Sequence, residues 1–142
     1  MYKVCALVSG GVDSCAMLYE LSSSFNGVYP LYIKFGLYWE KAEIYWLERF
    51  LVKLKNKNIK KLKILEIKAK DMYKEHWSIT GKNIPNEKSS DDKVYIPGRN
   101  ILLLSIASVF CEKNDISTIG IGVLKSNPFK DASKEFLNAV EK

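Results

Sequence analysis

The sequence predicts an α/β protein whose doubly wound, parallel sheet of about four strands carries helices on both faces. Strand-like and helix-like patterns alternate over the first 67 residues, an order typical of βαβ units with right-handed crossovers. The apolar run 4–8 leads directly into a glycine-containing turn and then into a helical pattern. With 142 residues, of which 47% are hydrophobic and 27% charged, the chain suits one globular domain, 1–142.

The first βαβ unit covers residues 3–35. Residues 3–8 are apolar on both faces, as expected of a strand covered by helices on both sides. A helix is expected over about 12–22, because serines and an Asn-Gly pair follow it and end it. Residues 28–35 are predicted to form the second strand, which a glycine turn terminates.

The turn between the first strand and the first helix has the composition of a phosphate-binding loop. Its residues are Ser9, Gly10, Gly11, Val12, Asp13 and Ser14. The glycines let the backbone approach an anion, the serines add hydroxyl donors, and the first N–H groups of the helix point at it. Asp13 repels phosphate, so we expect it to orient a loop N–H or a metal ion that accompanies phosphate. The alternative is an ordinary strand-to-helix turn with a serine cap.

The second unit adds a helix over 39–54 and a strand over 62–67. The helix is predicted from apolar residues that recur at steps of three and four. Residues 71–93 break the pattern, because they are polar and too long for a plain connector. Aromatic side chains and His76 argue against pure disorder, so we expect a partly ordered lid at about 71–95 over the nucleotide site.

The C-terminal part contains one further strand and two helices. Residues 101–111 are apolar nearly all round, which predicts a central helix. Residues 116–123 read as the fourth strand, and a turn follows. Asp131 or Ser133 is expected to cap a last helix over 134–142.

Arg99 and Asn100 follow a Pro-Gly turn at the start of the helix predicted over 101–111. The guanidinium of Arg99 is available there for a phosphate or a carboxylate. The alternative for Arg99 is a surface salt bridge.

Cysteine use and apolar patterning indicate a cytoplasmic protein. The three cysteines, Cys5, Cys15 and Cys111, lie inside apolar runs without metal-ligand spacing, so we expect buried free thiols and no metal site of cysteine type. We find no apolar run of 18 residues and no signal peptide pattern, and therefore expect no membrane span.

Positive charge is concentrated at residues 53–70, which hold eight lysines and one acid, whereas the rest of the chain has 14 basic and 15 acidic residues. The segment leaves contact with nucleic acid open. We favour a solvated helix end and strand edge, because no aromatic or arginine residue is interleaved between the lysines.

Several segments together resemble a known family. The loop at 9–14 resembles the SGG-x-DS signature of the PP-loop (N-type) ATP pyrophosphatases, which bind ATP through its pyrophosphate and cleave between the α- and β-phosphates. More specific matches resemble the 7-cyano-7-deazaguanine synthase (QueC or ExsB) family. They are Phe35-Gly36 with Trp39-Glu40, His76-Trp77-Ser78 with Thr80-Gly81, Tyr95 to Asn100, and Gly122 with Ser126-Asn127-Pro128-Phe129, Asp131 and Glu135-Phe136.

The resemblance implies an ATP-dependent carbon–nitrogen ligase with the Rossmann-like, adenine nucleotide alpha hydrolase-like fold. Such a ligase activates the carboxylate of 7-carboxy-7-deazaguanine as an acyl phosphate derivative, admits ammonia and dehydrates the amide to a nitrile. The product enters queuosine or archaeosine biosynthesis, a tRNA modification pathway. The implied cofactors are ATP and Mg²⁺.

The resemblance also assigns roles to residues. The loop from Ser9 to Ser14 holds the pyrophosphate of ATP, and the backbone near Phe35 and Gly36 borders adenine. Arg99 and Asn100 bind phosphate or substrate. Two acidic side chains, Asp131 and Glu135, face the deazapurine or ammonia. The implied catalytic set is Asp13, Arg99, Asp131 and Glu135.

Two departures from the family pattern shape the expectation. Residues 35–39 replace a Tyr-Gly-Gln-Arg-His run, which indicates a divergent subgroup. The family continues with a fifth strand, further helices and a four-cysteine zinc site, and the zinc cysteines are absent from this sequence. We therefore expect a C-terminally short relative, a fragment, or a chain that completes its fold by association, for example as a homodimer.

Two other functions remain open from the sequence. One is a non-catalytic ATP-binding relative that has lost the substrate half. The other is a PP-loop tRNA-modifying enzyme, which the lysines at 53–70 would serve. Sulfur-transfer members of that class need a positioned pair of reactive cysteines, and the three cysteines here do not provide one.

Overall fold

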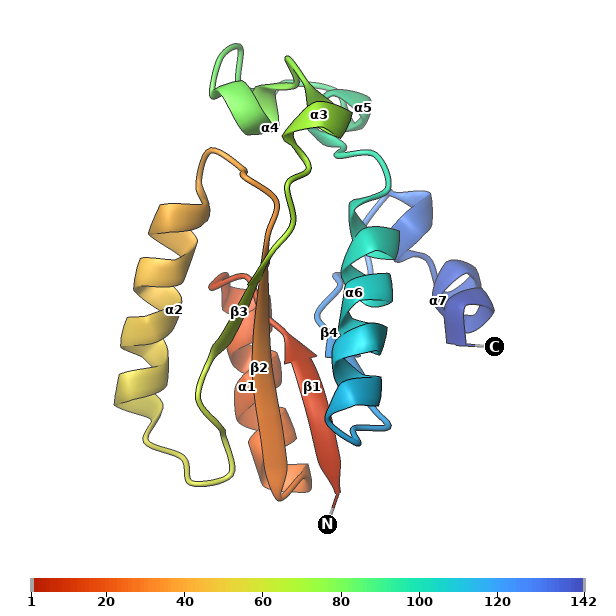
Figure 1. Cartoon of the computed structure of the whole chain (residues 1–142). Helices are drawn as coiled ribbons and strands as arrows, with labels where there is room; N and C mark the ends of the chain where they lie inside the picture. Colours follow the sequence, from red (N-terminus) through yellow and green to blue (C-terminus); the bar gives the residue numbers. More distant parts are fainter. Residues whose placement is uncertain (1, 142) are drawn as a thin grey trace.

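The computed structural model describes residues 2–141 and confirms the predicted class, with a four-stranded parallel sheet in the order β3-β2-β1-β4 (Figure 1). The strands are β1 (Lys3–Leu7), β2 (Gly27–Lys34), β3 (Lys63–Glu66) and β4 (Ile119–Ile121). Leu7 of β1 pairs with Leu31 on one side and Ile121 on the other. The strand order therefore reverses at β1, which creates a crevice at the carboxyl ends of the central strands.

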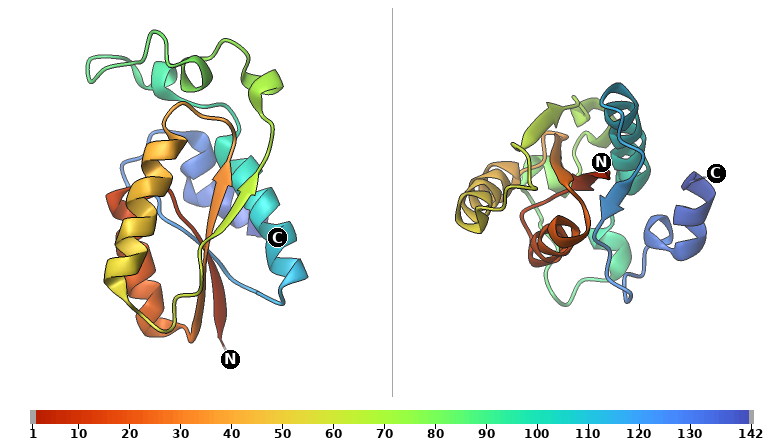
Figure 2. Two further views of the ribbon diagram at one scale, coloured as in Figure 1. Left: turned by 60° about the vertical axis from the view of Figure 1, so that its left-hand side comes forward. Right: turned by 90° about the horizontal axis from the view of Figure 1, so that it is seen from below.

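Helices cover both faces of the sheet. The helices α1 (Val12–Ser24) and α2 (Glu40–Leu54) lie on one face, and α6 (Arg99–Lys113) and α7 (Lys134–Glu141) lie on the other (Figure 2). Alternate side chains of β1 enter the two resulting cores, because successive residues of a strand point to opposite faces. Val4 and Ala6 pack with Leu18 of α1, whereas Cys5 and Leu7 pack on the α6 side.

Helix α6 is less enclosed than its sequence predicts. The expectation of a central helix is wrong within residues 2–141, because only one side of α6 packs on the sheet, through Leu104, Ala107 and Cys111. On its outer side Ile101 is 46% and Val109 is 65% exposed. Residues 91–113 have the length and composition of a membrane span. We interpret them as a core helix and its lead-in, because α6 contacts β1 and β4.

The C-terminal elements differ in detail from the prediction. Strand β4 is limited to three residues, since its pairing with β1 runs only from Cys5↔Ile119 to Leu7↔Ile121. A short 3₁₀ helix, η1 (Lys130–Ala132), precedes α7. Ser133 caps α7, as its hydroxyl accepts a hydrogen bond from the N–H of Phe136 at 3.1 Å.

The three cysteines are free, as predicted. Cys5 and Cys111 are buried and Cys15 is half-buried. Burial raises the pKa of all three thiols, so they are weak nucleophiles.

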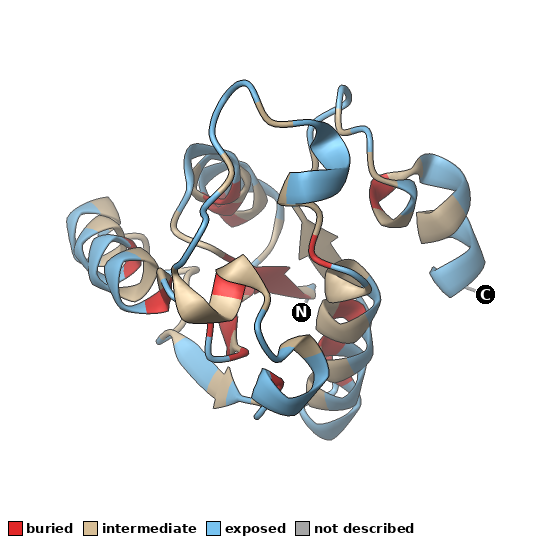
Figure 3. Cartoon of the chain, turned by 90° about the horizontal axis from the view of Figure 1, so that it is seen from above, coloured by how far each residue is buried: buried red, intermediate tan, exposed pale blue. Residues whose placement is uncertain are grey.

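The segment predicted as a lid folds into three short helices above the carboxyl ends of the strands (Figure 1). They are α3 (Lys70–Tyr73), α4 (Trp77–Thr80) and α5 (Asp91–Val94). Most of their residues are exposed or half-buried (Figure 3), but Ser78 is fully buried.

Specific contacts attach the lid to the elements beneath it. Trp77 stacks on Trp39 at 5.4 Å between ring centroids, and its indole N–H donates to the carbonyl of Lys93 at 2.8 Å. The N–H of Tyr38 donates to the carbonyl of Ser78 at 2.7 Å. The lid therefore has more fixed structure than its polar composition indicates.

Candidate functional site

A cavity of about 210 Å³ lies at the carboxyl ends of β1, β2 and β4. Two helix N-termini reach it, that of α1 through the loop after β1 and that of α6 through the turn before it. Six of the residues predicted from the sequence line the cavity: Ser9, Gly11, Asp13, Ser14, Arg99 and Asn100. A crevice with two helix N-termini suits an anionic ligand, because unpaired backbone N–H groups and helix dipoles favour negative charge there.

The loop after β1 is held by one hydroxyl group. The side chain of Ser14 is buried and accepts hydrogen bonds from the N–H groups of Ser9 and Gly10, both at 3.2 Å. It also donates to the carbonyl of Gly11 at 3.1 Å. These bonds fix the loop in the absence of a ligand, while the N–H groups of the first turn of α1 are not used within the helix.

Gly10 is required by both conformation and packing. Its φ of +80° lies in the left-handed region, and a Cβ added there would lie 2.6 Å from the carbonyl oxygen of Glu43. The loop thus packs directly on α2, and a larger residue at Gly10 would push the two apart.

The turn before α6 presents a cation without a partner. Arg99 lines the cavity. Its Nε is buried and has no hydrogen-bond partner among residues 2–141. Among the same residues the one ion pair is Lys34–Glu66. The Arg99 guanidinium therefore has no carboxylate of these residues within 4.0 Å. A buried polar atom without a partner is costly, which makes Arg99 available to an anionic ligand.

Asn100 ties α6 to the segment after β4. Its N–H donates to Oδ2 of Asp131 at 3.3 Å, and its side-chain amide donates to the carbonyl of Asp131 at 3.1 Å. Asp131 therefore places a carboxylate at the N-terminus of α6, where negative charge is stabilised.

Two acidic residues of α2, Glu43 and Glu40, form hydrogen bonds with residues of β2 and of the loop that follows it. Tyr32, which lines the cavity, donates its hydroxyl to Glu43 at 2.5 Å. Burial raises the pKa of Glu43, and the hydrogen bond from Tyr32 and the charge of Arg99 oppose this rise. Burial and the bond to Glu43 raise the pKa of Tyr32, so its hydroxyl stays protonated.

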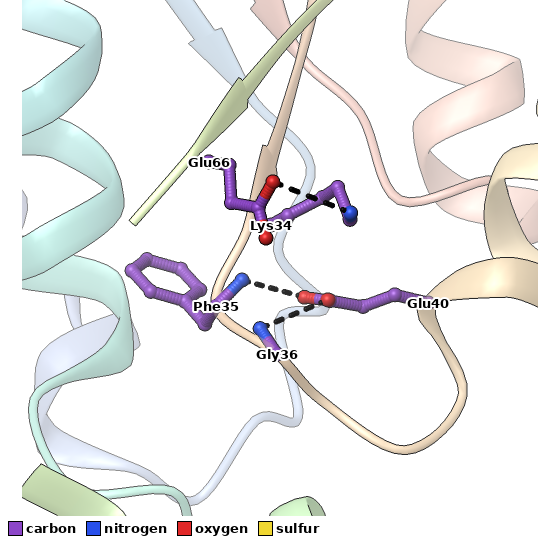
Figure 4. Close-up of polar contacts among 5 residues, drawn as sticks. All are labelled: Lys34, Phe35, Gly36, Glu40 and Glu66. Atoms are coloured by element: carbon purple, nitrogen blue, oxygen red, sulfur yellow. Dashed lines mark hydrogen bonds and ion pairs between the residues drawn. The ribbon is translucent and has the colours of Figure 1, made fainter. Parts of the chain in front are cut away.

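The second acidic residue, Glu40, organises the loop between β2 and α2 (Figure 4). Its carboxylate is 3% exposed and accepts hydrogen bonds from the N–H groups of Phe35 at 2.6 Å and Gly36 at 3.0 Å. The Lys34–Glu66 ion pair lies beside them at 3.6 Å and joins β2 to β3. Because Glu40 occupies both N–H groups, these two donors are not free for a ligand.

The remaining predicted residues lie outside this cavity. Gly10 belongs to the loop but, with Val12, borders a groove between α1 and α2. Phe35 is buried and does not line the cavity, and Asp131 lines a smaller neighbouring cavity. Glu135 is exposed on α7. The structure thus brings the loop and Arg99 together and keeps Glu135 apart from them.

Sequence reasoning assigned no site role to several lining residues, among them Ile33, Gly122 and Asn127, although the last two lie in segments that resemble the family. Ile33 and Gly122 lie at the carboxyl ends of β2 and β4. The rule that parallel strands bind ligands at this end could have identified them once the strand order was known.

Metal ligands are sparse in the part of the chain that the structure describes. Residues 2–141 contain no group of three or more His, Cys, Asp or Glu side chains that could hold a metal ion. Asp13 is the carboxylate of the loop and lines the cavity. Mg²⁺ commonly binds through one or two carboxylates together with substrate phosphates, and Asp13 meets that requirement.

Comparison with known proteins gives a consistent match. The family model for queuosine biosynthesis protein QueC matches residues 3–142. The 7-cyano-7-deazaguanine synthase 1 of Desulfitobacterium hafniense is 32% identical over 143 residues, which cover 98% of this chain and 63% of that protein.

Two further relatives show the same pattern. The 7-cyano-7-deazaguanine synthase of a Sulfurihydrogenibium species is 30% identical, with 98% of this chain and 63% of that protein covered. The 7-cyano-7-deazaguanine synthase of Aquifex aeolicus is 29% identical, with 97% and 64% covered. The chain thus spans less than two thirds of the length of these relatives.

Proposed function

The chain belongs to the QueC family, and on that premise we propose that it binds ATP and acts as a 7-cyano-7-deazaguanine synthase. It would activate the carboxylate of 7-carboxy-7-deazaguanine with ATP and convert it, with ammonia, into a nitrile. One observation carries the proposal: four residues of the loop line the same cavity as Arg99, and no carboxylate of residues 2–141 forms an ion pair with Arg99.

The phosphates of ATP would lie between the two helix N-termini. The first N–H groups of α1 would donate to the pyrophosphate, with the loop held in place by Ser14. Arg99 would pair with a phosphate from the opposite side through its planar fork of donors. Within the described part of the chain no carboxylate forms an ion pair with Arg99, which supports this role because its charge is left for the ligand.

Asp13 would hold the Mg²⁺ that accompanies ATP. When bound, the ion would neutralise part of the negative charge of the phosphates. This role accounts for an acidic residue in a loop that otherwise favours anions.

The adenine base would lie against the backbone at the end of β2. The pairing of β1 with β2 ends at Leu7↔Leu31, and Ile33, two residues further along β2, lines the cavity. The N–H groups of Phe35 and Gly36 are bound by Glu40, which favours Ile33 over them as the hydrogen-bonding contact to the base.

The proposed chemistry makes a carboxylate reactive toward ammonia. A carboxylate oxygen attacks a phosphorus of ATP, the bond to the leaving phosphate group breaks, and an acyl phosphate derivative forms. Ammonia then attacks the carbonyl carbon and loses a proton, and the phosphate group leaves with its oxygen, which gives the amide. The amide oxygen would attack a second ATP in the same way; it then leaves bonded to the phosphate group while the nitrogen loses both protons, which gives the nitrile. Arg99 would stabilise negative charge on the phosphates during transfer.

A titration with Mg-ATP followed by a product assay tests the proposal. The purified protein is titrated calorimetrically with Mg-ATP, and then incubated with ATP, 7-carboxy-7-deazaguanine and ammonium while mass spectrometry follows the nitrile. The proposal expects binding, nitrile formation and ATP consumption that depends on the acid. Absence of Mg-ATP binding overturns it entirely, and binding without nitrile limits the function to ATP binding.

A further inference from the structure

A groove of about 700 Å³ lies at the C-terminal end of α2. The last turns of α2, the loop 55–62 and Ile64 of β3 line it, and it shares no lining residue with the proposed ATP cavity. Figure 1 shows this end of α2 at the amino ends of the strands, opposite the lid. We call it the lysine groove, and a ligand there would bind apart from the ATP site.

Lysine side chains give the groove its charge, and apolar side chains line most of the rest. None of its lysines forms an ion pair within residues 2–141, because the ion pair found there joins Lys34 and Glu66. Unpaired positive charge concentrated in one groove attracts a polyanion. The charged residues that line the groove are Lys55, Lys57, Lys60, Lys61 and Glu48.

The loop that carries these lysines has a fixed backbone. The side-chain amide of Asn56 donates to the hydroxyl of Ser22 at 2.9 Å, and that of Asn58 donates to the carbonyl of Ser22 at 2.9 Å. The carbonyl of Asn58 also accepts the N–H of Val28 in β2 at 2.8 Å. The lysines are therefore presented from an ordered loop, and a partner does not have to order the backbone when it binds.

Lys55 has a backbone conformation that suits glycine better. It is the C-terminal cap of α2, and its φ of +45° lies in the left-handed region. Helices commonly end on Gly or Asn in this conformation, because other side chains are disfavoured there sterically. The position thus keeps a positive charge although glycine would fit better, which indicates a use for the charge.

Aromatic and guanidinium groups lie beside the groove on α2. Tyr45, Arg49 and Val52 share one face of the helix, because they are three and four residues apart, and Val52 lines the groove. The guanidinium of Arg49 lies 4.6 Å from the centroid of the Tyr45 ring, and the exposed Trp46 packs edge-on against that ring at 5.2 Å. The segment 53–70 has no stacking side chain of its own, but the fold supplies them from α2.

Protection of the sheet edge does not account for the groove lysines. Strand β3 is an edge strand, and a lysine on such a strand opposes pairing with another chain. Lys63 is the lysine of β3, whereas the four groove lysines precede the strand. These four charges therefore need another explanation.

We propose that the lysine groove and the adjoining face of α2 bind single-stranded nucleic acid. Its phosphates lie along the groove lysines, and its bases stack on the exposed rings of Tyr45 and Trp46. From Tyr45 to Lys55 the helix rises by about 15 Å, which leaves room for a few bases stacked about 3.4 Å apart. A duplex fits less well, because its bases already stack on one another. This binding goes beyond the proposed function and does not depend on it.

Salt-dependent binding of a short RNA tests the contribution of the lysines. Fluorescence anisotropy follows a labelled oligouridylate of about 12 nucleotides at several salt concentrations. Lys57→Gln combined with Lys61→Gln should weaken binding and reduce the slope of log affinity against log salt by about 1.4, because each phosphate contact of a single strand contributes about 0.7. The matched control, Lys113→Gln combined with Lys134→Gln, removes the same charge from exposed positions of α6 and α7 and should leave the slope nearly unchanged.

Three single variants test the other parts of the surface. Trp46→Ala should weaken the RNA by about tenfold, because stacking of a base is lost. Glu48→Gln should strengthen it about two- to fivefold, because a carboxylate that repels phosphate is removed from the groove. Lys55→Gly should weaken binding without lowering the free energy of unfolding in urea, because glycine readily adopts the positive φ.

The proposal is overturned if the wild type shows no salt-dependent binding, or if the groove and control double variants lose affinity equally, since net charge alone would then attract RNA. Binding of inorganic polyphosphate or of duplex RNA as tight as that of the single strand also overturns it, because neither offers a free base. Every variant should bind Mg-ATP like the wild type. Absence of Mg-ATP binding in the wild type would overturn the proposed function and leave the RNA result standing.

Discussion

The loop after β1 and the turn before α6 both bring a helix N-terminus to the same cavity, but they differ in how far their polar groups are already hydrogen-bonded. The loop satisfies its own groups, because the Ser14 hydroxyl binds the N–H groups of Ser9 and Gly10 and the carbonyl of Gly11. In the turn, the buried Nε of Arg99 has no hydrogen-bond partner among residues 2–141, and none of their carboxylates is in ion-pair range. The conformation of the loop is therefore fixed by its own hydrogen bonds, whereas the turn carries a positive charge that remains available to a ligand.

This difference predicts that the two regions respond differently to mutation. Substitutions in the loop should lower stability and ATP affinity together, because the same bonds hold the loop and form the binding surface. Substitution of Arg99 at the turn should lower activity without lowering stability, because a group without partners contributes little to folding. The following four experiments test this contrast.

Replacing Arg99 should have the largest effect. Arg99→Ala should lower nitrile formation by about 100- to 1,000-fold, the usual loss when one charge-stabilising donor is removed. Its free energy of unfolding should stay unchanged or rise, because a buried atom without a partner is removed. Single-turnover assays and urea unfolding measure the two effects, and full activity would show that the charge of Arg99 has no role in the reaction.

Replacing Ser14 should affect the loop in the opposite way. Ser14→Ala removes the acceptor of two half-buried N–H groups and should lower the free energy of unfolding by about 1–2 kcal/mol. Ser105→Ala is a matched control, since that exposed hydroxyl donates only to the carbonyl of Ile101 within α6. Chemical denaturation compares the two variants, and equal stabilities would show that the loop bonds contribute nothing.

Replacing Asp13 should change how binding depends on magnesium. Asp13→Asn should weaken Mg-ATP by about tenfold, because the carboxylate ligand of the ion is lost. Without magnesium the variant should bind ATP at least as well as the wild type, because a charge that repels phosphate has gone. Titrations with Mg²⁺ and with a chelator measure both, and an equal loss in the two conditions would exclude the magnesium role.

Replacing Glu43 should have the smallest effect and should depend on pH. The pKa of Glu43 is raised above its ordinary value of 4.5, so its contribution to stability is present below that value and is lost as pH rises through the folded pKa. Glu43→Gln cannot ionise but can still accept the Tyr32 hydroxyl. Its stability relative to the wild type should therefore increase with pH, which unfolding curves between about pH 5 and 8 measure. A constant difference would mean that Glu43 does not titrate in this range.

The sequence was a good guide wherever the physical cause is local. The run before Ser9 and the glycines after it predict a strand, a turn and a helix, and β1 and α1 lie there. The cap at Ser133 follows from the same kind of local rule. These features depend on residues within a few positions of one another, which the sequence displays directly.

The remaining features depend on pairs that are distant in the chain. Asn100 and Asp131 are 31 residues apart, and only the fold reveals that they bind each other. The bonds from Phe35 and Gly36 to Glu40 were missed although they span four or five residues, because a charged residue at a helix start has many possible partners. The exposed side of α6 could not be predicted either, since composition does not say how many faces of a helix are covered.

The stacked tryptophans have a practical consequence for spectroscopy. The chain has three tryptophans, and two of them, Trp39 and Trp77, stack at 5.4 Å with planes 25° apart, whereas Trp46 is 63% exposed on α2. Closely stacked indoles couple their electronic transitions, so the pair should give a circular dichroism couplet that an isolated indole lacks. Trp39 precedes α2 and Trp77 belongs to the lid, so the couplet reports whether the two segments are in contact. The protein thus carries an optical label of its own, and no dye needs to be attached.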